Sequence, residues 1–248
     1  MALKVPVKWH QCYETTLYHE STMDHTTIEG RYEMREIKKT DALHIQVYQI
    51  VKEKILNGEF QPNERLVESK LAEQIGVSRG TVREAIRMLT KDELIEQRDS
   101  YLFVYNPSQN DIIDIYECRR SLELLSVRLA AQKITDDQLK DLNRIIKYSK
   151  EALEKNDTEK MTRLNQQFHD TITLSSQNKQ LIQLFEVIST KVLYIRNCLL
   201  KGHTYSFPVL INDHEQILQA LKERDPIKAE TLMNNHIETS LKVVHSPS

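Results

Sequence analysis

The chain has 248 residues and a formal net charge of −2, so it has room for two modest domains, and its overall charge does not point to nucleic acid. Hydrophobic residues make up 40% and charged residues 28%, as expected of a soluble globular protein. The three cysteines lie far apart, so we expect no disulfide framework. No apolar run of about 18 residues occurs and the N-terminus has no cleavable apolar segment, so we expect neither a membrane span nor a secretion signal. We therefore expect a protein of the reducing cytoplasm, and the small number of Gly and Pro residues favours helices.

The first part of the chain shows no sustained hydrophobic period. We interpret residues 1–40 as an irregular N-terminal extension, of which 1–33 lies outside the fold. An ordered N-terminal arm is the alternative.

Residues 41–106 show the pattern of a small helical domain that ends in a hairpin. Apolar residues at spacings of three and four begin at Ala42 and predict a helix that stops at Asn57-Gly58. A second helix begins near Val67-Glu68, and Gly76 predicts a sharp turn before a third helix capped by Ser78. Residues 94–105 are rich in β-branched and aromatic side chains, so they predict two short strands around Asp99-Ser100 and give the only clear strand signal in the chain.

The third helix has two contrasting faces. Its inward positions are apolar: Val82, Ala85, Ile86 and Leu89. Its outward positions carry a cation every four residues, opposed mainly by Glu84: Arg79, Arg83, Arg87 and Lys91. Such a stripe on an isolated helix is most simply a solvated face. Here it follows an Ile-Gly-Val-Ser turn and precedes a hairpin, which favours DNA binding through phosphate contacts and guanine edges.

The rest of the chain is helical. Asn106-Pro107 is a natural boundary, and residues 109–245 predict an antiparallel bundle of about six helices. The expected helices are 109–133, 136–155, 158–176, 179–201, 208–224 and 226–244. The fold class is therefore mainly α, with an N-terminal winged helix-turn-helix domain and a C-terminal all-helical antiparallel bundle.

Three of the expected bundle helices carry a histidine on their apolar face. Asn165 and His169 are one turn apart, and His214 and His236 are each flanked by apolar residues at helical spacing. A single inward histidine is most often a hydrogen-bonded core residue. Three on separate helices suggest converging imidazoles that could bind a divalent metal ion.

Arg119 is also predicted to point into the bundle, because it follows Ile115 by four residues and precedes Leu122 by three. A buried guanidinium is costly without a partner. It either forms an internal ion pair, for instance with Glu123, or serves as a fork for an effector carboxylate. Arg196 is a second, weaker candidate for effector binding.

Residues 71–89, Leu-Ala-Glu-Gln-Ile-Gly-Val-Ser-Arg-Gly-Thr-Val-Arg-Glu-Ala-Ile-Arg-Met-Leu, resemble the winged helix-turn-helix of GntR-family regulators. The resemblance implies DNA contacts by Ser78, Arg79 and Arg83, with Thr81 as a phosphate contact. The family's wing usually carries Gly at its tip, whereas this chain has Asp99-Ser100-Tyr101 there. Whether the wing contacts DNA is therefore open.

The resemblance extends over about 41–244. Four short segments resemble the FCD effector domain of the FadR-type subgroup: 116–123, 165–169, 213–217 and 236–237. The resemblance implies a metal site formed by Asn165, His169, His214 and His236, in which Asn165 replaces the usual Asp. The neutral amide is a weaker ligand than a carboxylate, so zinc, nickel and manganese all remain candidates.

These features together predict a transcriptional repressor that binds double-stranded operator DNA as a homodimer and responds to a small organic acid. An enzyme is not expected, because no His-Glu-x-x-His arrangement, nucleophile elbow or phosphate loop is present. A constitutive DNA-binding protein with a structural bundle is the main alternative, and a metal-dependent hydrolase is a more distant one.

Overall fold

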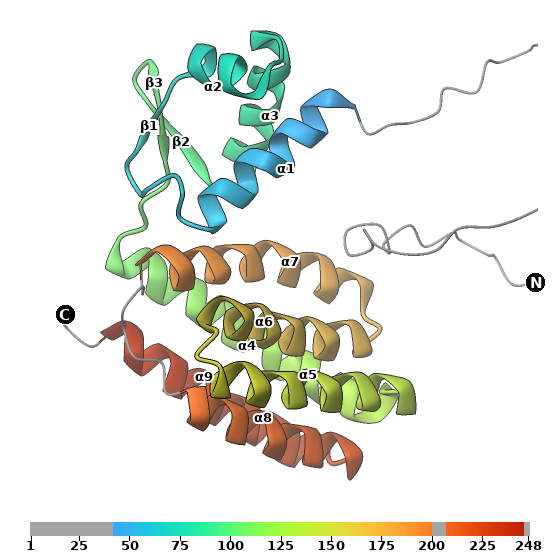
Figure 1. Cartoon of the computed structure of the whole chain (residues 1–248). Helices are drawn as coiled ribbons and strands as arrows, with labels where there is room; N and C mark the ends of the chain where they lie inside the picture. The colour runs from blue at the N-terminus through green and yellow to red at the C-terminus, as the bar shows by residue number, and fades with distance from the viewer. Residues whose placement is uncertain (1–41, 200–206, 246–248) are drawn as a thin grey trace, which may run out of the picture. The chain divides into compact units, whose positions relative to one another are not determined.

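A computed structural model describes residues 42–199 and 207–245. The extension expected at 1–40 therefore lies outside the described residues. The structure is mainly α, as predicted (Figure 1). No helix in the two described ranges is long and apolar enough to cross a membrane.

The first part of the described chain consists of three helices and a small sheet. Its elements in order are α1 (Leu43–Leu56), β1 (Arg65–Leu66), α2 (Glu68–Ile75), α3 (Arg79–Lys91), β2 (Ile95–Arg98) and β3 (Tyr101–Val104). The three strands form an antiparallel sheet in the order β1-β3-β2. Our expectation of only two strands is wrong, because β1 adds a third. A strand of two residues is too short to show an alternating pattern in the sequence.

The helix-turn-helix is held by its turn and its buried face. Gly76 ends α2 in the left-handed region with φ 76°, where a residue without Cβ is unstrained. The Ser78 side chain accepts a hydrogen bond from the Thr81 backbone N–H at the start of α3, so it caps that helix as predicted. The four inward residues of α3 are buried against α1, as the sequence predicted.

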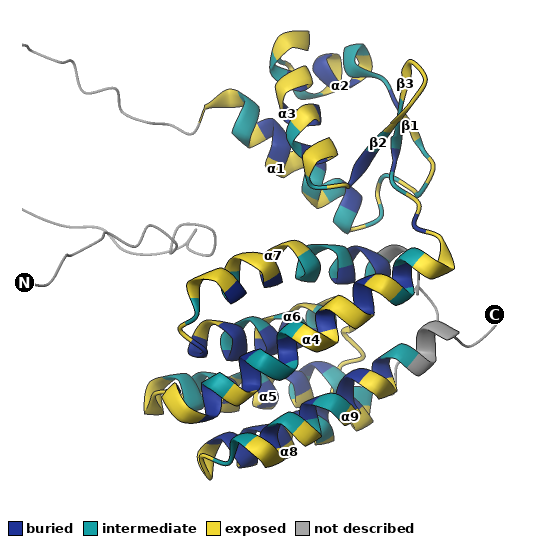
Figure 2. Cartoon of the chain, turned by 180° about the vertical axis from the view of Figure 1, so that it is seen from behind, coloured by how far each residue is buried: buried dark blue, intermediate teal, exposed yellow. Residues whose placement is uncertain are grey.

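The second part of the described chain is a bundle of helices, and Figure 2 shows their buried faces turned toward one another. Its helices are α4 (Gln109–Lys133), α5 (Asp136–Glu154), α6 (Thr158–Ser175), α7 (Lys179–Tyr194), α8 (Phe207–Lys222) and α9 (Pro226–His245). Helix α4 contacts α6, α7, α8 and α9, so side chains from all of these helices can meet beside it. The expected helix 179–201 is α-helical only to Tyr194, and a π-helical turn, Ile195–Leu199, follows.

Alanine substitutions at two glycines near the turn between α2 and α3 should change stability in opposite directions. A Cβ at Gly76 would meet no atom within 4 Å, but its positive φ would strain an L-residue, so Gly76→Ala should cost about 1 kcal/mol. A Cβ at Gly80 would lie 3.7 Å from the Ser78 Oγ, an ordinary contact, and Gly80→Ala should stabilise by about 0.5 kcal/mol. Urea unfolding of the two variants beside wild type measures both. Equal effects of the same sign would contradict the assigned turn geometry.

Candidate DNA interface and metal site

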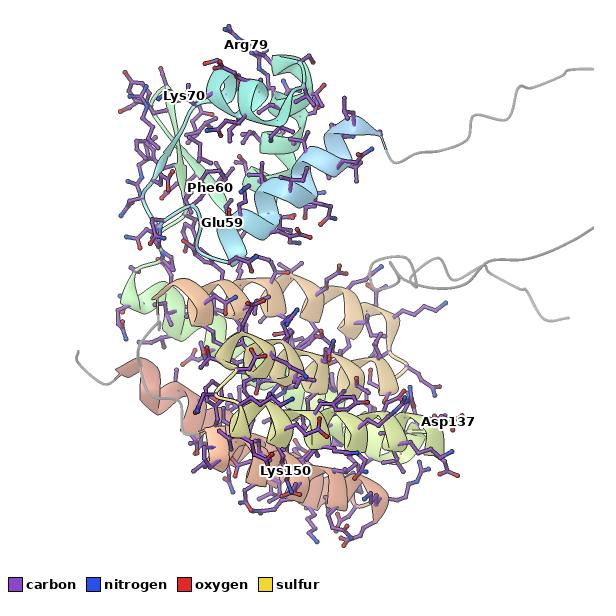
Figure 3. All side chains as sticks on the ribbon, in the orientation of Figure 1. Glu59, Phe60, Lys70, Arg79, Asp137 and Lys150 are labelled. Carbon is purple, nitrogen blue, oxygen red and sulfur yellow. The ribbon has the colours of Figure 1, made fainter. Side chains whose placement is uncertain are left out.

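The cations predicted to contact DNA lie on one exposed face of α3. Arg79, Arg83 and Arg87 are all exposed, and Figure 3 shows the Arg79 side chain extending away from the ribbon. Thr81 is half-buried, and its hydroxyl lies 2.9 Å from the Ser78 hydroxyl at the N-terminus of the helix. Backbone N–H groups at that end also favour an anion, so this end of α3 is electrostatically the more suitable place for a negative charge.

Two of these arginines have carboxylate neighbours. Arg87 Nη1 lies 2.6 Å from Glu84, and Arg83 Nη2 lies 3.3 Å from Glu68 on α2. The sequence had identified only Glu84, because Glu68 reaches the stripe from another helix. Exposed pairs of this kind contribute at most about 1 kcal/mol, so a phosphate can replace the carboxylate at little cost.

The three inward histidines converge. His169 on α6, His214 on α8 and His236 on α9 are buried, and their potential ligand atoms all lie within 4.8 Å of one another. The sequence predicted this convergence from three separate helical periods. Within the described residues, this is the only group of three or more His, Cys, Asp or Glu side chains close enough to hold a metal ion.

Two carboxylates fix which ring nitrogens face the centre of the cluster. The His169 Nδ1 contacts the Glu123 carboxylate, and the His236 Nδ1 lies 3.2 Å from Asp213 Oδ2. We assign the proton to Nδ1 in both rings, so each Nε2 carries a lone pair. The two Nε2 atoms lie 3.3 Å apart, which is about the separation of two nitrogens on one tetrahedral zinc ion. A cation between them would remove the repulsion of their lone pairs.

Two further buried polar atoms have no hydrogen-bond partner. They are the Asn165 Oδ1 and the His214 Nε2. The His214 ring stacks on Phe168 with 3.8 Å between ring centroids, which fixes its orientation. Unsatisfied buried polar atoms are costly unless something binds them. The three converging imidazoles therefore suit a borderline divalent ion, and Asn165, one helical turn before His169, offers a buried oxygen without a partner.

Arg119 forms the internal ion pair that the sequence offered as one of two alternatives. Its Nε lies 2.5 Å from Glu123 Oε1, and both side chains are only 2% exposed. Its Nη2 lies 3.3 Å from His169 Nε2, and its Nη1 is buried without a partner. One edge of the guanidinium is thus used by Glu123, and the other faces the histidines. Arg196 is half-buried, and its charge acts on His214.

Burial keeps the three imidazoles neutral. Desolvation lowers the pKa of His169 to about 3 against the opposing pull of Glu123, and it lowers the pKa values of His214 and His236 as well. Burial alone would raise the pKa of Glu123, but the charges of Arg119 and His169 outweigh it and hold that pKa well below its usual range. Neutral imidazoles are the form that binds a metal ion.

Sequence reasoning missed the two carboxylates behind the histidines. Glu123 had been considered only as a partner for Arg119, and Asp213 had no assigned role. Carboxylates that accept from the outer nitrogen of a metal-binding histidine orient the ring and raise its basicity. Asp213 had a visible signal, since it directly precedes His214, but its contact is with His236 on the next helix. Such a contact has no fixed spacing in the sequence.

The chain was compared with known families. Residues 43–100 match the family described as bacterial regulatory proteins, gntR family, and residues 114–239 match the FCD domain. The chain belongs to the GntR family. This GntR-family regulator is 31% identical over 193 residues to YdhC, an HTH-type transcriptional regulator of Bacillus subtilis, with 77% of this chain and 85% of YdhC covered.

Two further comparisons agree with that assignment. The gluconate operon transcriptional repressor of Bacillus licheniformis is 24% identical over 176 residues, covering 69% of this regulator and 72% of that protein. The solved structure of E. coli McbR/YncC matches in fold with a TM-score of 0.73 at 24% identity, covering 83% of this chain and 98% of that one. The relatives are transcription regulators and not enzymes, as the sequence predicted. This protein is therefore a DNA-binding transcriptional regulator with an FCD effector-binding domain.

The lowered histidine pKa values predict how stability depends on pH. An unfolded histidine binds a proton near pH 6.5, whereas the buried ones stay neutral to lower pH, so the unfolded state binds more protons below that value. With a chelator present, the free energy of unfolding should fall below about pH 6.5, with a slope approaching 1.4 kcal/mol per pH unit for each histidine.

Urea unfolding at several pH values between 7.5 and 5 measures this slope, with those pH values set at roughly half-unit intervals. The variant His214→Asn cannot take up the proton, so its slope should be smaller by about one proton. Identical slopes in the variant and wild type would show that His214 is already protonated in the folded protein.

Proposed function

We propose that this GntR-family regulator is a repressor that binds operator DNA as a homodimer in the cytoplasm and is controlled by a small organic acid at a metal ion in the bundle. The convergence of three neutral imidazoles within 4.8 Å carries the proposal. The name of the Bacillus licheniformis relative supports the repressor role and the acid, since it describes a repressor of a gluconate operon.

In this proposal α3 is the recognition helix that enters the major groove. The DNA-contacting residues are Ser78, Arg79, Thr81, Arg83 and Arg87. Arg79 and Arg83 stand nearest the N-terminal end of α3, so they are assigned to base edges and adjacent phosphates. Arg87, a further turn along, is assigned to the phosphate backbone.

The proposed division of labour follows the two parts of the chain. Residues 41–106 bind DNA, and residues 109–245 bind the effector and dimerise. A helix-turn-helix reads two half-sites of a near-palindromic operator, which requires two copies related by a two-fold axis. The bundle is the proposed interface, because most apolar residues of the DNA-binding part are already used in its own core.

The proposed metal ligands are Asn165, His169, His214 and His236. Zinc, nickel or manganese fits this set, and the neutral Asn165 disfavours a hard ion that needs carboxylate charge. When bound, the ion supplies open coordination positions for an effector carboxylate. The chain's own residues orient the site, through Glu123 behind His169 and Asp213 behind His236.

Arg119 is the proposed second anchor for the effector. Its Nη1 is buried without a partner, and its Nη2 lies 3.3 Å from the His169 Nε2. An acidic group bound to that edge would sit next to the metal ligands. Arg196 is proposed to contribute positive charge on the side of His214.

Effector binding has a physical route to the DNA-binding part. The Tyr194 hydroxyl donates to the Tyr105 carbonyl at 2.5 Å, and the Asn197 amide donates to the Leu56 carbonyl at 2.9 Å. Arg196 lies on the same turn. We propose that an effector held by this turn and the metal ion shifts the junction at 106–107, which needs only a few kcal/mol of differential affinity between two arrangements.

The recognition helix is tested by removing its cations. Arg79→Ala and Arg83→Ala should each weaken binding to a selected operator by about 1–3 kcal/mol without unfolding the protein, because both side chains are exposed. If Arg79 reads a base, its loss should also relax specificity at one position. Fluorescence anisotropy gives the affinities, and light scattering of the complex gives the number of chains per operator.

Arg144→Ala is the matched control for that experiment, since it removes one exposed cation from α5 in the bundle. It should bind the operator like wild type. Unchanged binding in both α3 variants would overturn the choice of recognition helix, and one chain per operator would overturn the homodimer.

The metal site is tested by elemental analysis of protein purified without chelator. Wild type should carry or take up one divalent ion per chain, and His214→Ala should lose it. Asp213→Asn should weaken metal affinity by about 10- to 100-fold, because it removes the carboxylate behind His236. Glu215→Gln is the matched control on the same helix, since Glu215 pairs only with Lys150 at the surface.

Calorimetry of the metal-loaded protein against a panel of carboxylic acids then tests the effector, and Arg119→Lys should weaken the response because Lys lacks the planar fork. A wild type that takes up no ion at micromolar concentration would reduce the histidines to core residues. The regulator would then be a constitutive DNA-binding protein with a structural bundle.

A further inference from the structure

A cleft of about 430 Å³ lies beside the recognition helix, between it and the sheet. Residues of β1, α2, α3 and the β2–β3 hairpin line it. Three of them are arginines, Arg65, Arg79 and Arg83, and one is the carboxylate Glu68. The cleft is thus cationic, and Arg65 reaches it from a strand that the sequence did not predict.

Arg65 is held there by an aromatic ring. Its guanidinium carbon lies 3.7 Å from the centroid of the Tyr101 ring. The strand register explains the contact: Arg65 pairs with Phe103 on β3, and Tyr101 is two residues further along the same face of that strand. Tyr101 is 47% exposed, so the stack lies at the surface of the molecule.

The stacked guanidinium keeps its donors free. Stacking uses the face of the planar group and leaves its N–H edge available for a phosphate. The neighbouring cations Arg83, Arg87 and Arg98 each lie beside a carboxylate. Among the described residues, none forms an ion pair or hydrogen bond with Arg65.

The tip of the β2–β3 hairpin is less suited to contacting DNA phosphates than the cleft that contains Arg65. Asp99 occupies the turn with φ 55°, where Asp is tolerated, and it places a negative charge at the tip. A carboxylate there disfavours close approach to phosphates. In the cleft, three arginines outnumber one carboxylate, Glu68, which pairs with Arg83.

We propose that Arg65, positioned by Tyr101, binds a DNA phosphate beside the recognition helix, so that β1 rather than the hairpin tip is the second DNA-contacting element. This inference rests on the proposed function of α3. Arg65 then strengthens binding to any sequence, while α3 distinguishes between sequences. Tyr101 is a positioning residue, since it acts through the guanidinium.

The test uses the full-length protein, a duplex operator selected by wild type from random DNA, and a non-cognate duplex of equal length. Arg65→Ala should weaken binding to both duplexes by the same factor, roughly three- to tenfold. The slope of log affinity against log salt should become shallower by about 0.9 for each protomer bound. Arg65→Lys should keep most of that slope, because the charge remains.

Tyr101 is tested by the same titrations. Tyr101→Ala should weaken binding by a smaller factor while leaving the salt slope near that of wild type, and Tyr101→Phe should restore the affinity because it keeps the ring. The double variant Arg65→Ala/Tyr101→Ala should bind no more weakly than Arg65→Ala alone. A structural role of Tyr101 would instead make the two losses additive.

Arg98→Ala is the matched control, because it removes a cation of the same sheet whose donors are already bonded to Asn63 and Glu96. An equal loss of slope in Arg98→Ala would assign the effect to net charge and overturn the inference. So would wild-type affinity and slope in Arg65→Ala, even where Arg79→Ala loses binding. Failure of wild type to select any DNA would instead overturn the proposed function, so the two failures are distinguishable.

Discussion

The ion pairs of the buried Glu123 carboxylate are the interactions on which the bundle and its proposed ligand site both depend. One oxygen is bonded by the Arg119 guanidinium on the same helix, and the other by the His169 ring on α6. Removing one partner of such a buried pair typically costs about 3–5 kcal/mol, because a charge is left without compensation. With both oxygens bonded, α4 and α6 can pack around polar groups, and the His169 ring is held with Nε2 turned toward the other histidines. Stability and site geometry therefore share one contact.

The same contact determines the charge of the site. Arg119 and Glu123 offset each other. Asp213 lies behind His236, while the charge of Arg196 acts on His214. The imidazoles and the Asn165 amide are neutral. A divalent ion bound to these ligands would keep much of its charge among buried side chains. An anion bound beside such an ion would relieve that charge, which is the physical reason for proposing an acidic effector. An aspartate at position 165 would itself have neutralised part of the charge of such an ion.

Features that repeat along one helix were predictable from the sequence, whereas pairings between particular side chains on different elements were not. The buried face of α3 and the inward histidines follow from helical periodicity, which a single segment carries by itself. The turn at Gly76 and the cap at Ser78 follow from local backbone chemistry. The ion pair of Glu123 with His169 and the stack of Arg65 on Tyr101 join residues 46 and 36 positions apart in the numbering, and no period links them. The strand β1 was missed because two residues owe their conformation to the partner strand β3.

The sequence also failed to predict the π-helical turn Ile195–Leu199, and this turn bears on how the two parts of the chain are connected. Apolar periodicity continued through 179–201 and predicted an unbroken α-helix, since a single wide turn barely alters the pattern. In the structure, α7 contributes Tyr194 to the core of the DNA-binding part, while Arg196 acts on His214 in the bundle. Asn197 then donates to the last carbonyl of α1. Arg196 and Asn197, consecutive residues of this turn, thus act on a bundle histidine and on the DNA-binding part, respectively. In a regular α-helix, each side chain is rotated by a fixed angle about the helix axis relative to the one before it. A local π-helical turn changes that rotation while the backbone hydrogen bonds continue. Any ligand that tightens or loosens this turn must change contacts on both sides of it.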